Sequence, residues 1–178
     1  MKNLAWVLYV FLSCMIQRGY AASDGMDNVH FHGALVAEPC KILDSDANIL
    51  LDFGTVIESY LYEYHRTLSK PFAIHLTDCD PSLYNTVSVT FQGTADSELT
   101  DFLALDPTST AKGVAIGLTL SDGTPLAVNK ASPYSMLSSG NNTLYFKTFI
   151  EAKPSGLLNN SLQVGEFRSV ATFVLSYQ

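Results

Sequence analysis

The amino-acid sequence predicts an all-β protein built as an antiparallel β-sandwich. Short runs of alternating apolar and polar residues recur along the chain, and turn-forming pairs such as Asp-Gly, Asp-Pro and Gln-Gly separate them. No segment shows the sustained 3.6-residue apolar stripe of a long amphipathic helix. The 178 residues are 47% hydrophobic and 15% charged, enough to bury the core of one domain. Since no repeat or low-complexity linker divides the chain, we expect a single domain.

The first 21 residues have the pattern of a secretory signal. An apolar run from Leu4 to Ile16 precedes a small-residue pattern, which predicts cleavage after Ala21 or Ala22. About thirteen apolar residues are fewer than the roughly 20 that a membrane-spanning helix needs. A lipoprotein anchor at Cys14 is an alternative, but the apolar run continues past this cysteine. We therefore expect residues 1–21 to be the signal peptide of an exported protein.

The chain that follows this signal is strongly acidic. All 17 Asp and Glu residues come after it, whereas two of the ten Lys and Arg residues, Lys2 and Arg18, lie within it. The mature chain therefore has eight basic and seventeen acidic residues, a net charge of −9. Such a charge disfavours contact with a phosphate backbone, so we expect no nucleic-acid partner.

Strand patterns cover most of the chain after residue 40. The alternating and apolar runs predict strands over 50–54, 71–79, 86–91, 103–105, 113–120 and 142–150. Asp122-Gly123 is the strongest hairpin-turn signal in the chain and follows one of these runs directly. Residues 60–65 are rich in aromatic side chains and ambiguous in structure, and residues 153–156 have the composition of a turn.

Two cysteines remain after the signal, since Cys14 lies within it. Cys40 and Cys79 form an even number in an exported chain, and an oxidising compartment favours disulfides. We expect one bond between them, which closes a loop of about 40 residues and contributes roughly 3 to 4 kcal/mol. A metal site is the less favoured alternative, because no further His or Cys stands nearby at ligand spacing.

The last stretch, from Gly165 to Gln178, has the most regular strand pattern. Every second residue near its end is apolar: Ala171, Phe173, Leu175 and Tyr177. No later segment of the sequence follows that could pair with the free side of this strand. A long, apolar, unpaired strand is an edge that must be hidden or is offered to another chain.

This stretch resembles the C-terminal signature of pilus subunits that Gram-negative bacteria assemble by the chaperone–usher route. Gly165 stands fourteen positions from the end, alternating apolar residues follow it, and Tyr177 is the residue before the last. The resemblance covers essentially the whole mature chain. It implies the pilin fold, an incomplete immunoglobulin-like β-sandwich that lacks its last strand, over residues 37–178. It also implies that a disulfide joins the first strand to the end of the second.

Residues 22–36, ahead of the first cysteine, carry another alternating row. The residues on its apolar face are Val29, Phe31, Gly33 and Leu35. Periodicity alone favours an ordinary first strand of the domain's own core. The resemblance instead implies an N-terminal donor strand that inserts into a neighbouring subunit, where Gly33 lets its backbone pass a bulky residue. His30 and His32 lie on the other face and are expected to face solvent, since no third metal ligand is apparent.

The resemblance further implies partners for the C-terminal edge. A periplasmic pilus chaperone first lends a strand to this edge, and at an outer-membrane usher the extension of another subunit replaces it. The edge residues concerned are Gly165, Ala171, Phe173, Leu175, Tyr177 and Gln178. We expect a minor or adaptor subunit of a pilus, or fimbria, that is exported through the periplasm to the cell surface and contacts neighbouring pilus subunits there.

Motifs of catalysis are not found in the sequence. It has no Gly-x-Ser-x-Gly, no phosphate-binding glycine loop and no His-Glu-x-x-His, so we expect no enzyme, no cofactor and no metal. One alternative from a different class stays open: a self-contained secreted β-sandwich that binds a ligand or acts as an adhesive module. Its sugar-stacking face would use Tyr60, Tyr62, Tyr64 and Tyr134.

Overall fold

A computed structural model describes residues 31–32 and 38–178 of the protein. The chain divides into two compact units, Met1–Val36 and Ala37–Gln178, and the fold below is that of the second. The expected signal peptide and the expected donor residues Val29, Gly33 and Leu35 lie outside the described residues.

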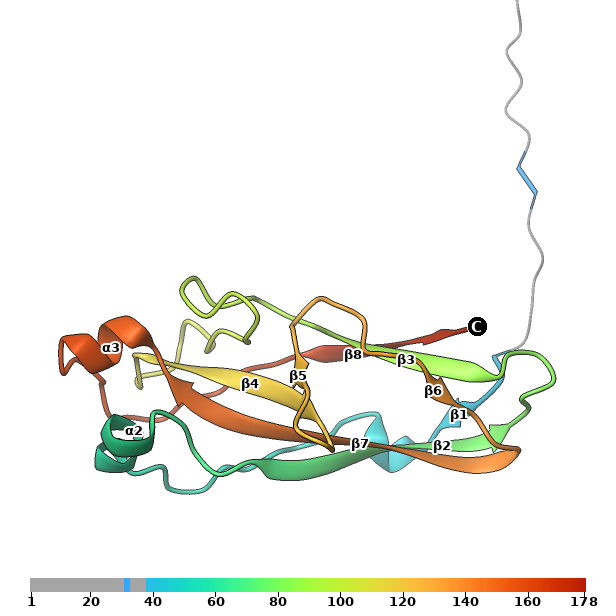
Figure 1. Ribbon diagram of the computed structural model, residues 1–178, viewed down its shortest axis with the longest axis horizontal. Helices are drawn as coiled ribbons and strands as arrows, with labels where there is room; N and C mark the ends of the chain where they lie inside the picture. Colours follow the sequence, from blue (N-terminus) through green and yellow to red (C-terminus); the bar gives the residue numbers. More distant parts are fainter. Residues whose placement is uncertain (1–30, 33–37) are drawn as a thin grey trace, which may run out of the picture. The chain divides into compact units, whose positions relative to one another are not determined.

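Two antiparallel sheets make up the second unit (Figure 1). One sheet has five strands in the order β1-β2-β7-β4-β5, and the other has three in the order β6-β3-β8. The strands are β1 Lys41–Ile42, β2 Lys70–Cys79, β3 Thr86–Gln92, β4 Val114–Leu120, β5 Pro125–Leu126, β6 Ser135–Met136, β7 Gly140–Ala152 and β8 Thr172–Tyr177. Three short helices complete the unit: η1 Asp44–Asp46, α2 Glu58–Tyr64 and α3 Pro154–Leu158. The predicted all-β sandwich is confirmed.

The core lies between the two sheets, where the alternating apolar residues of each strand meet. Rings from both sheets interlock there: Phe91 of β3 packs edge-to-face on Phe146 of β7 with centroids 5.1 Å apart, and Phe72 of β2 lies 5.9 Å from Phe91. Such edge-to-face packing adds to the hydrophobic gain of burying the rings. Residues buried around them include Ile74, Leu76, Val87, Val89 and Leu144.

The disulfide between Cys40 and Cys79 is present, as the cysteine count predicts. Both residues are buried in the core cluster. The bond joins the residue before β1 to the last residue of β2, and Asp80 N–H donates to the carbonyl of Pro39 beside it (2.7 Å). The start of the domain is thereby fixed to the end of a central strand.

Two expectations for the strands were wrong, and tertiary packing explains both. Residues 50–54 are extended but belong to no strand, because they pair with no neighbour. Residues 103–105 contribute only isolated bridges, in which Leu103 pairs with Ala95 and with Ile116 of β4.

Helices replace an ambiguous segment and an expected turn. Residues 58–64 form α2 because Leu61 is buried against a second apolar cluster, and the hydroxyl of Tyr62 accepts a hydrogen bond from Leu162 N–H (3.1 Å). Residues 154–156, part of the expected turn, begin α3, where Pro154 occupies the first turn and its missing N–H costs no hydrogen bond. The hairpin turn at Asp122-Gly123 is confirmed: Leu120 N–H donates to the carbonyl of Thr124, and Gly123 has a φ of +95°.

The sandwich has two ends, called here the disulfide end and the helical end (Figure 1). At the disulfide end, β2 finishes, β7 begins, and the end of β8 pairs with the start of β3. At the helical end, α2 precedes β2, α3 follows β7, and the chain approaches β8.

A buried carboxylate fixes the chain after β1. Asp46 of η1 accepts hydrogen bonds from the main-chain N–H of His75 (2.6 Å) and the hydroxyl of Ser45 (3.1 Å), and the Nδ1 of His75 lies 2.7 Å from it. Burial by itself raises the pKa of Asp46, but the hydrogen bonds from His75 and Ser45 outweigh it and hold this pKa below its usual value. The charged form of Asp46 therefore stabilises the fold.

We predict that Asp46→Asn lowers the free energy of unfolding at pH 7 by about 1 to 3 kcal/mol, because a charged acceptor of buried donors is lost. The pKa of Asp46 is lower in the folded than in the unfolded chain, so this stabilisation is present above about pH 4 and disappears as the pH falls further. Denaturant unfolding at pH 7 and pH 2.5 should show the variant and the wild type converging in acid. The control is Asp44→Asn, an exposed residue of the same helix.

Candidate functional site

The two lateral sides of the sandwich differ. On one side residues 127–134 cross from β5 to β6 and join the two sheets, with Ser132 N–H donating to the carbonyl of Val89 (2.8 Å). On the other side the edges are β1 and β8, and within 38–178 no strand connects them. This side is called the open edge below.

Strand β8 presents unpaired main-chain groups at the open edge. Gln178 N–H donates to the carbonyl of Thr86 (3.1 Å) and its own main-chain oxygen accepts from Thr86 N–H (2.9 Å), so these two residues form a hydrogen-bonded pair. Hydrogen-bonded and non-hydrogen-bonded pairs alternate along an antiparallel ladder. The N–H and C=O groups that point away from β3 therefore belong to Phe173, Leu175 and Tyr177. Within the described residues no strand pairs with them.

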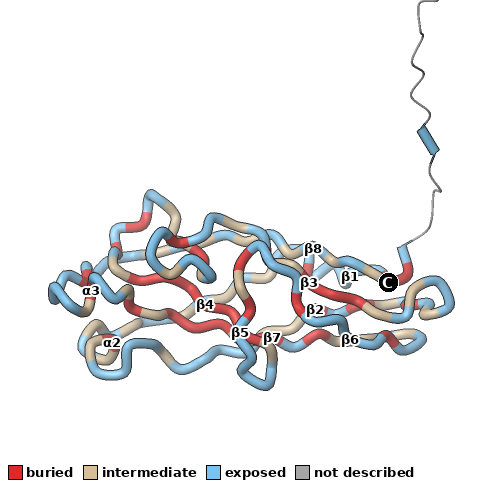
Figure 2. Tube along the Cα trace, turned by 45° about the horizontal axis from the view of Figure 1, so that its top comes forward, coloured by how far each residue is buried: buried red, intermediate tan, exposed pale blue. Residues whose placement is uncertain are grey.

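The side chains of the same residues form an apolar row that is only half buried. Phe173, Leu175 and Tyr177 pack against the core cluster, yet each keeps part of its surface exposed, whereas the residues opposite them on β3 are buried. The central strand β4 is buried along nearly its whole length, while β8 alternates between intermediate and exposed (Figure 2). The core is therefore incompletely covered where β8 borders it.

A second unpaired segment borders the core. Residues 48–56 are extended, and their main chain makes no hydrogen bond to the main chain of another described residue. Ile49 and Phe53 pack, half buried, on the same core cluster, and Leu50 between them is 90% exposed. We call residues 48–56 the second wall. Sequence reasoning predicted a strand at residues 50–54, and the structure shows an extended but unpaired segment there.

Contacts at two points show where these segments meet the rest of the domain. Towards the helical end, the rings of Phe53 and Phe167 approach with centroids 6.1 Å apart, so the second wall touches the chain that leads into β8. At the disulfide end, burial raises the pKa of Tyr177 and the nearby Glu38 carboxylate raises it further. The half-buried row thus lies between Phe167 and Glu38.

Gly165 and Ala171, both predicted for this edge, precede β8 rather than belonging to it. Gly165 has a φ of +156°, and a Cβ on it would lie 2.8 Å from Ala111 N and collide with the Thr110 hydroxyl. Glu166, the next residue, accepts hydrogen bonds from Thr110 N–H (2.9 Å) and Ala111 N–H (3.1 Å). Glycine is needed at this crossing because the two chains run in direct contact.

The donor residues predicted from the sequence are described only at Phe31, whose side chain is 91% exposed. The four tyrosines of the alternative hypothesis do not form one face. Tyr60 and Tyr64 stack on each other along α2 (centroids 4.4 Å apart) and Tyr62 bonds to Leu162, whereas Tyr134 lies beside β6 near the disulfide end. The residues required for a common sugar-stacking surface are therefore separated.

In the described part of the chain, side chains of the types that bind metal ions do not cluster. Among residues 31–32 and 38–178 no three His, Cys, Asp or Glu side chains come together as metal ligands. No helix there has the length and apolar character to cross a membrane. A cavity of about 310 Å³ lies between β3 and the first half of β7, with an apolar base that includes Val87 and Leu144 and a rim that includes Ser121 and Ser135.

A two-sheet sandwich with one free, half-buried edge strand defines a pilin-type domain, and comparison with known proteins assigns its family. The family model described as fimbrial protein matches residues 29–178. The chain is 31% identical over 180 residues to the major MR/P fimbria protein of Proteus mirabilis, a match that covers 100% of this chain and 99% of that protein. It is also 31% identical over 156 residues to the type-1 fimbrial protein A chain of Salmonella typhi, covering 84% of this chain and 82% of that one.

This chain belongs to the fimbrial protein family and is a structural subunit of a cell-surface fimbria, not an enzyme. Its fold is shared with two solved structures. The P pilus rod subunit PapA superposes with a TM-score of 0.69 at 23% identity, over 79% of this chain and 100% of PapA. A subunit of a chaperone-usher pilus gives a TM-score of 0.67 at 24% identity, over 87% and 97%.

We predict that Gly165→Ala lowers the free energy of unfolding by about 1 to 3 kcal/mol, since the added methyl group displaces residues 110–111 and the approach to β8. The comparison variant is Gly123→Ala, whose Cβ meets no atom within 4 Å and which tests backbone strain at a positive φ alone. Thermal unfolding of both variants measures the difference. Equal losses would mean that the crossing at Gly165 has no special role.

Proposed function

We propose that this fimbrial subunit polymerises by donor-strand complementation and exchange. The observation that carries the proposal is the free edge of β8, where Phe173, Leu175 and Tyr177 combine unpaired main-chain groups with half-buried side chains. An extended segment from another molecule, laid along this edge, would hydrogen-bond the unpaired main-chain groups and cover the half-buried side chains.

The main-chain part of this pairing is a short ladder. Three residues of β8 offer six N–H and C=O groups to an incoming strand. Each hydrogen bond made there contributes about 0.5 to 1.5 kcal/mol net, because water is displaced from both partners. The ladder gives affinity without sequence preference, so the choice of partner depends on side chains that cover the apolar row.

The donor in a finished fibre is the extension at residues 22–36 of another subunit. Its apolar face, Val29, Phe31, Gly33 and Leu35, alternates with the same two-residue period as β8. Burying Val29, Phe31 and Leu35 contributes roughly 1.5 to 3 kcal/mol each, or about 5 to 9 kcal/mol in total before ordering costs. That is comparable with the whole stability of a small domain, roughly 5 to 15 kcal/mol.

The second wall supports the same proposal. Its main chain, like the free side of β8, makes no hydrogen bond to the main chain of another described residue, and its side chains Ile49 and Phe53 contact the same core. A strand placed between the second wall and β8 would face the free side of β8 on one flank and the main chain of the second wall on the other. The Phe53–Phe167 contact would then limit how far the donor extends towards the helical end.

The remaining steps follow from the expected export signal at residues 1–21. In this proposal a periplasmic chaperone occupies the edge of β8 first and holds the terminal carboxylate of Gln178 with basic residues. An outer-membrane usher then lets the extension of the next subunit replace the chaperone strand. One sandwich with one extension fits a subunit inside the fibre, and we propose a minor or adaptor position. Immunogold labelling of fibres would contradict that position if it decorated their whole length.

The direct test is to export the mature chain with and without its chaperone. Without any donor strand the chain is expected to aggregate or be degraded, because the edge of β8 and the apolar row stay exposed. Co-expression of the chaperone, or addition of a synthetic peptide of residues 22–36, should restore folded protein. A chain that folds cooperatively as a monomer, with no gain in thermal stability from the peptide, would overturn the proposal.

We predict that Gly33→Arg blocks incorporation into fibres but leaves chaperone binding intact, since residue 33 belongs to the donor and not to the acceptor edge. The physical reason is that a long side chain prevents close approach of the donor backbone. Co-purification with the chaperone and fibre yield measure the two steps separately. His32→Arg is the matched control, because its side chain would point away from the groove; fibre yield equal in both variants would refute the role of Gly33.

We predict that deleting Tyr177 and Gln178 abolishes chaperone capture and reduces the periplasmic amount of the subunit several-fold. The deletion removes one member of the half-buried row and the residue that closes the ladder with Thr86. Immunoblotting of periplasmic extracts provides the measurement. Ser176→Ala, which changes only an exposed side chain of β8, is the control. An unchanged level of the truncated chain would exclude the terminus from chaperone binding.

A further inference from the structure

The open edge is negatively charged where β8 ends. The terminal carboxylate of Gln178 is fixed there, because its main-chain oxygen accepts hydrogen bonds from Asn85 N–H and Thr86 N–H, both at 2.9 Å. Burial, and after it the charge of the exposed Glu38, raises the pKa of Tyr177, so the Glu38 carboxylate lies near the Tyr177 hydroxyl. Two carboxylates therefore stand at the end of the half-buried row.

Basic side chains do not balance these two carboxylates. The described segments that meet at this end are 38–41, 78–86, 135–143 and 172–178. They contain no histidine, and their only Lys or Arg is Lys41, whose Nζ is already paired with the Asp78 carboxylate at 2.9 Å. Asp80 adds a further acid, and its carboxylate accepts a hydrogen bond from the Ser82 hydroxyl (2.6 Å). A carboxylate brought to this end would therefore meet net repulsion.

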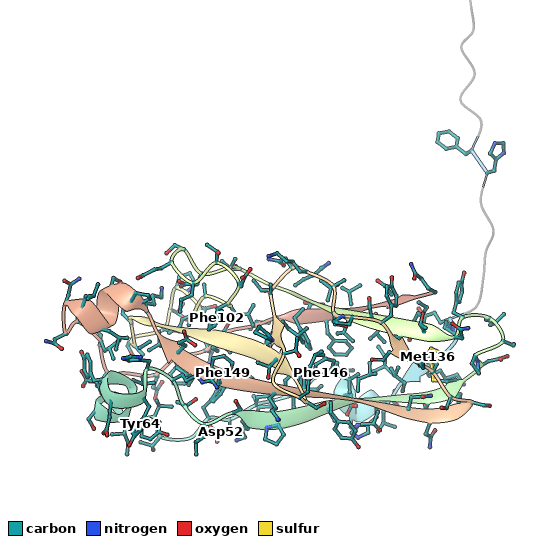
Figure 3. All side chains as sticks on the ribbon, in the orientation of Figure 1. Asp52, Tyr64, Phe102, Met136, Phe146 and Phe149 are labelled. Atoms are coloured by element: carbon teal, nitrogen blue, oxygen red, sulfur yellow. A yellow bond between two sulfur atoms is a disulfide. The ribbon has the colours of Figure 1, made fainter. Side chains whose placement is uncertain are left out.

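The direction of a donor strand on β8 follows from the positions of the two ends. Tyr64 lies at the helical end and Met136 at the disulfide end (Figure 3), and β8 runs from the first end to the second. Residue 36 is four positions before Cys40, so an extension leaves its own domain at the disulfide end. A fibre that grows without limit needs the disulfide end of one subunit against the helical end of the next, since two disulfide ends in contact would close a pair. The donor therefore enters from the helical end and runs antiparallel to β8.

The alternation of the extension includes Asp27. It has the same parity as the apolar row Val29, Phe31, Gly33 and Leu35, so Asp27 is the next inward position towards the amino terminus. In an antiparallel donor this position lies on the side of the disulfide end. The inward row of the donor thus ends in a carboxylate.

The open edge limits how far the donor can slide. The second wall contacts the ring of Phe167, so Leu35 of the donor can lie no farther towards the helical end than level with Ser169. Asp27 is eight residues from Leu35, which puts it level with Tyr177 or past the end of β8. Both positions are beside the two carboxylates described above.

We propose that Asp27 and Glu38 are specificity-determining residues, a pair of like charges that weakens the joint between two copies of this chain. The joint is the contact of one subunit's extension with the open edge of the next, and the proposal rests on the donor-strand assembly proposed above. A different subunit with a neutral or basic residue at the position of Asp27 would avoid the repulsion and bind this open edge more tightly. Such selection favours an unlike neighbour, in agreement with a minor or adaptor position.

Protonation would remove the repulsion. The pKa of Asp27 would be higher in the joint than in the free extension, because partial burial and two neighbouring carboxylates disfavour its charged form. Formation of the joint then takes up a proton. The repulsion is therefore fully present at neutral pH and decreases as the pH falls towards about 4, where a free aspartate is half protonated. The joint between two copies tightens in acid.

The test measures how synthetic peptides of residues 22–36 displace the chaperone from its complex with the full mature chain. The wild-type and Asp27→Asn peptides have the same shape, and both contain His30 and His32, so the ratio of their half-saturating concentrations reports the charge of residue 27 alone. Asp24→Asn is the control peptide, because residue 24 has the parity of the outward face.

The acceptor is tested with a matched pair of variants. Glu38→Gln removes the charge at the disulfide end, and Glu63→Gln removes an exposed charge of α2 at the helical end. Both peptides are measured on each variant, so any change in chaperone affinity cancels in their ratio.

At pH 7 the Asp27→Asn peptide should displace the chaperone at a roughly tenfold lower concentration than the wild-type peptide, an effect of the size of one close pair of like charges. The Asp24→Asn peptide should behave like the wild type. The ratio should approach one at pH 4, and also in about 1 M salt, where the Debye length is about 3 Å. Glu38→Gln should reduce the ratio several-fold, and Glu63→Gln should leave it unchanged.

Different outcomes separate this proposal from the assembly mechanism beneath it. Equal wild-type and Asp27→Asn peptides at pH 7, or a ratio that acid, salt or Glu38→Gln leaves unchanged, would overturn the charge pair while donor-strand assembly stands. An equal reduction by Glu63→Gln would overturn it as well. Failure of every peptide to displace the chaperone at either pH would refute donor-strand assembly, and the charge pair with it.

Discussion

The structure depends on one constraint: main-chain N–H and C=O groups need partners, and the strand that borders the core has partners on one side only. Almost all buried backbone groups in folded proteins are hydrogen-bonded, and an exposed strand edge is a template for pairing with another strand. Here the side chains of the same three residues of β8 pack against the core and are only half buried. The unpaired main-chain groups and the half-buried side chains lie on the same strand, so a single extended segment would pair the first and cover the second.

The rest of the domain keeps this edge in position. The Cys40–Cys79 bond fixes the start of the chain to β2, and the Asp46–His75 contact fixes the segment that precedes the second wall. Gly165 permits the crossing at residues 110–111 that directs the chain into β8. On the opposite side, residues 127–134 join the two sheets. The two sheets are therefore connected along one side. Along the other side the chain fixes the position of β8 but no strand of the described residues pairs with its free edge.

Much of the fold could be predicted from the sequence because strands with one buried face leave a two-residue pattern. That pattern located β2, β3, β4, β7 and β8, and cysteine parity after the signal gave the disulfide. It could not place residues 48–56, because alternation shows that a segment has an inner face but not whether another strand pairs with it. Helix α2 was also missed as a helix, since burial of Leu61 and the Tyr62–Leu162 bond are tertiary effects.

The disulfide has a mechanical consequence for a fibre under tension. In the fibre proposed above, force transmitted through an extension at residues 22–36 would enter the domain just before Cys40, where β1 contributes only two residues of pairing. A strand this short would peel away at low load. The covalent bond to Cys79 would pass the pull instead to β2, which is paired to β7 over most of its length. The load is then shared by many hydrogen bonds strained in shear, so the subunit body would resist stretching better than its own first strand.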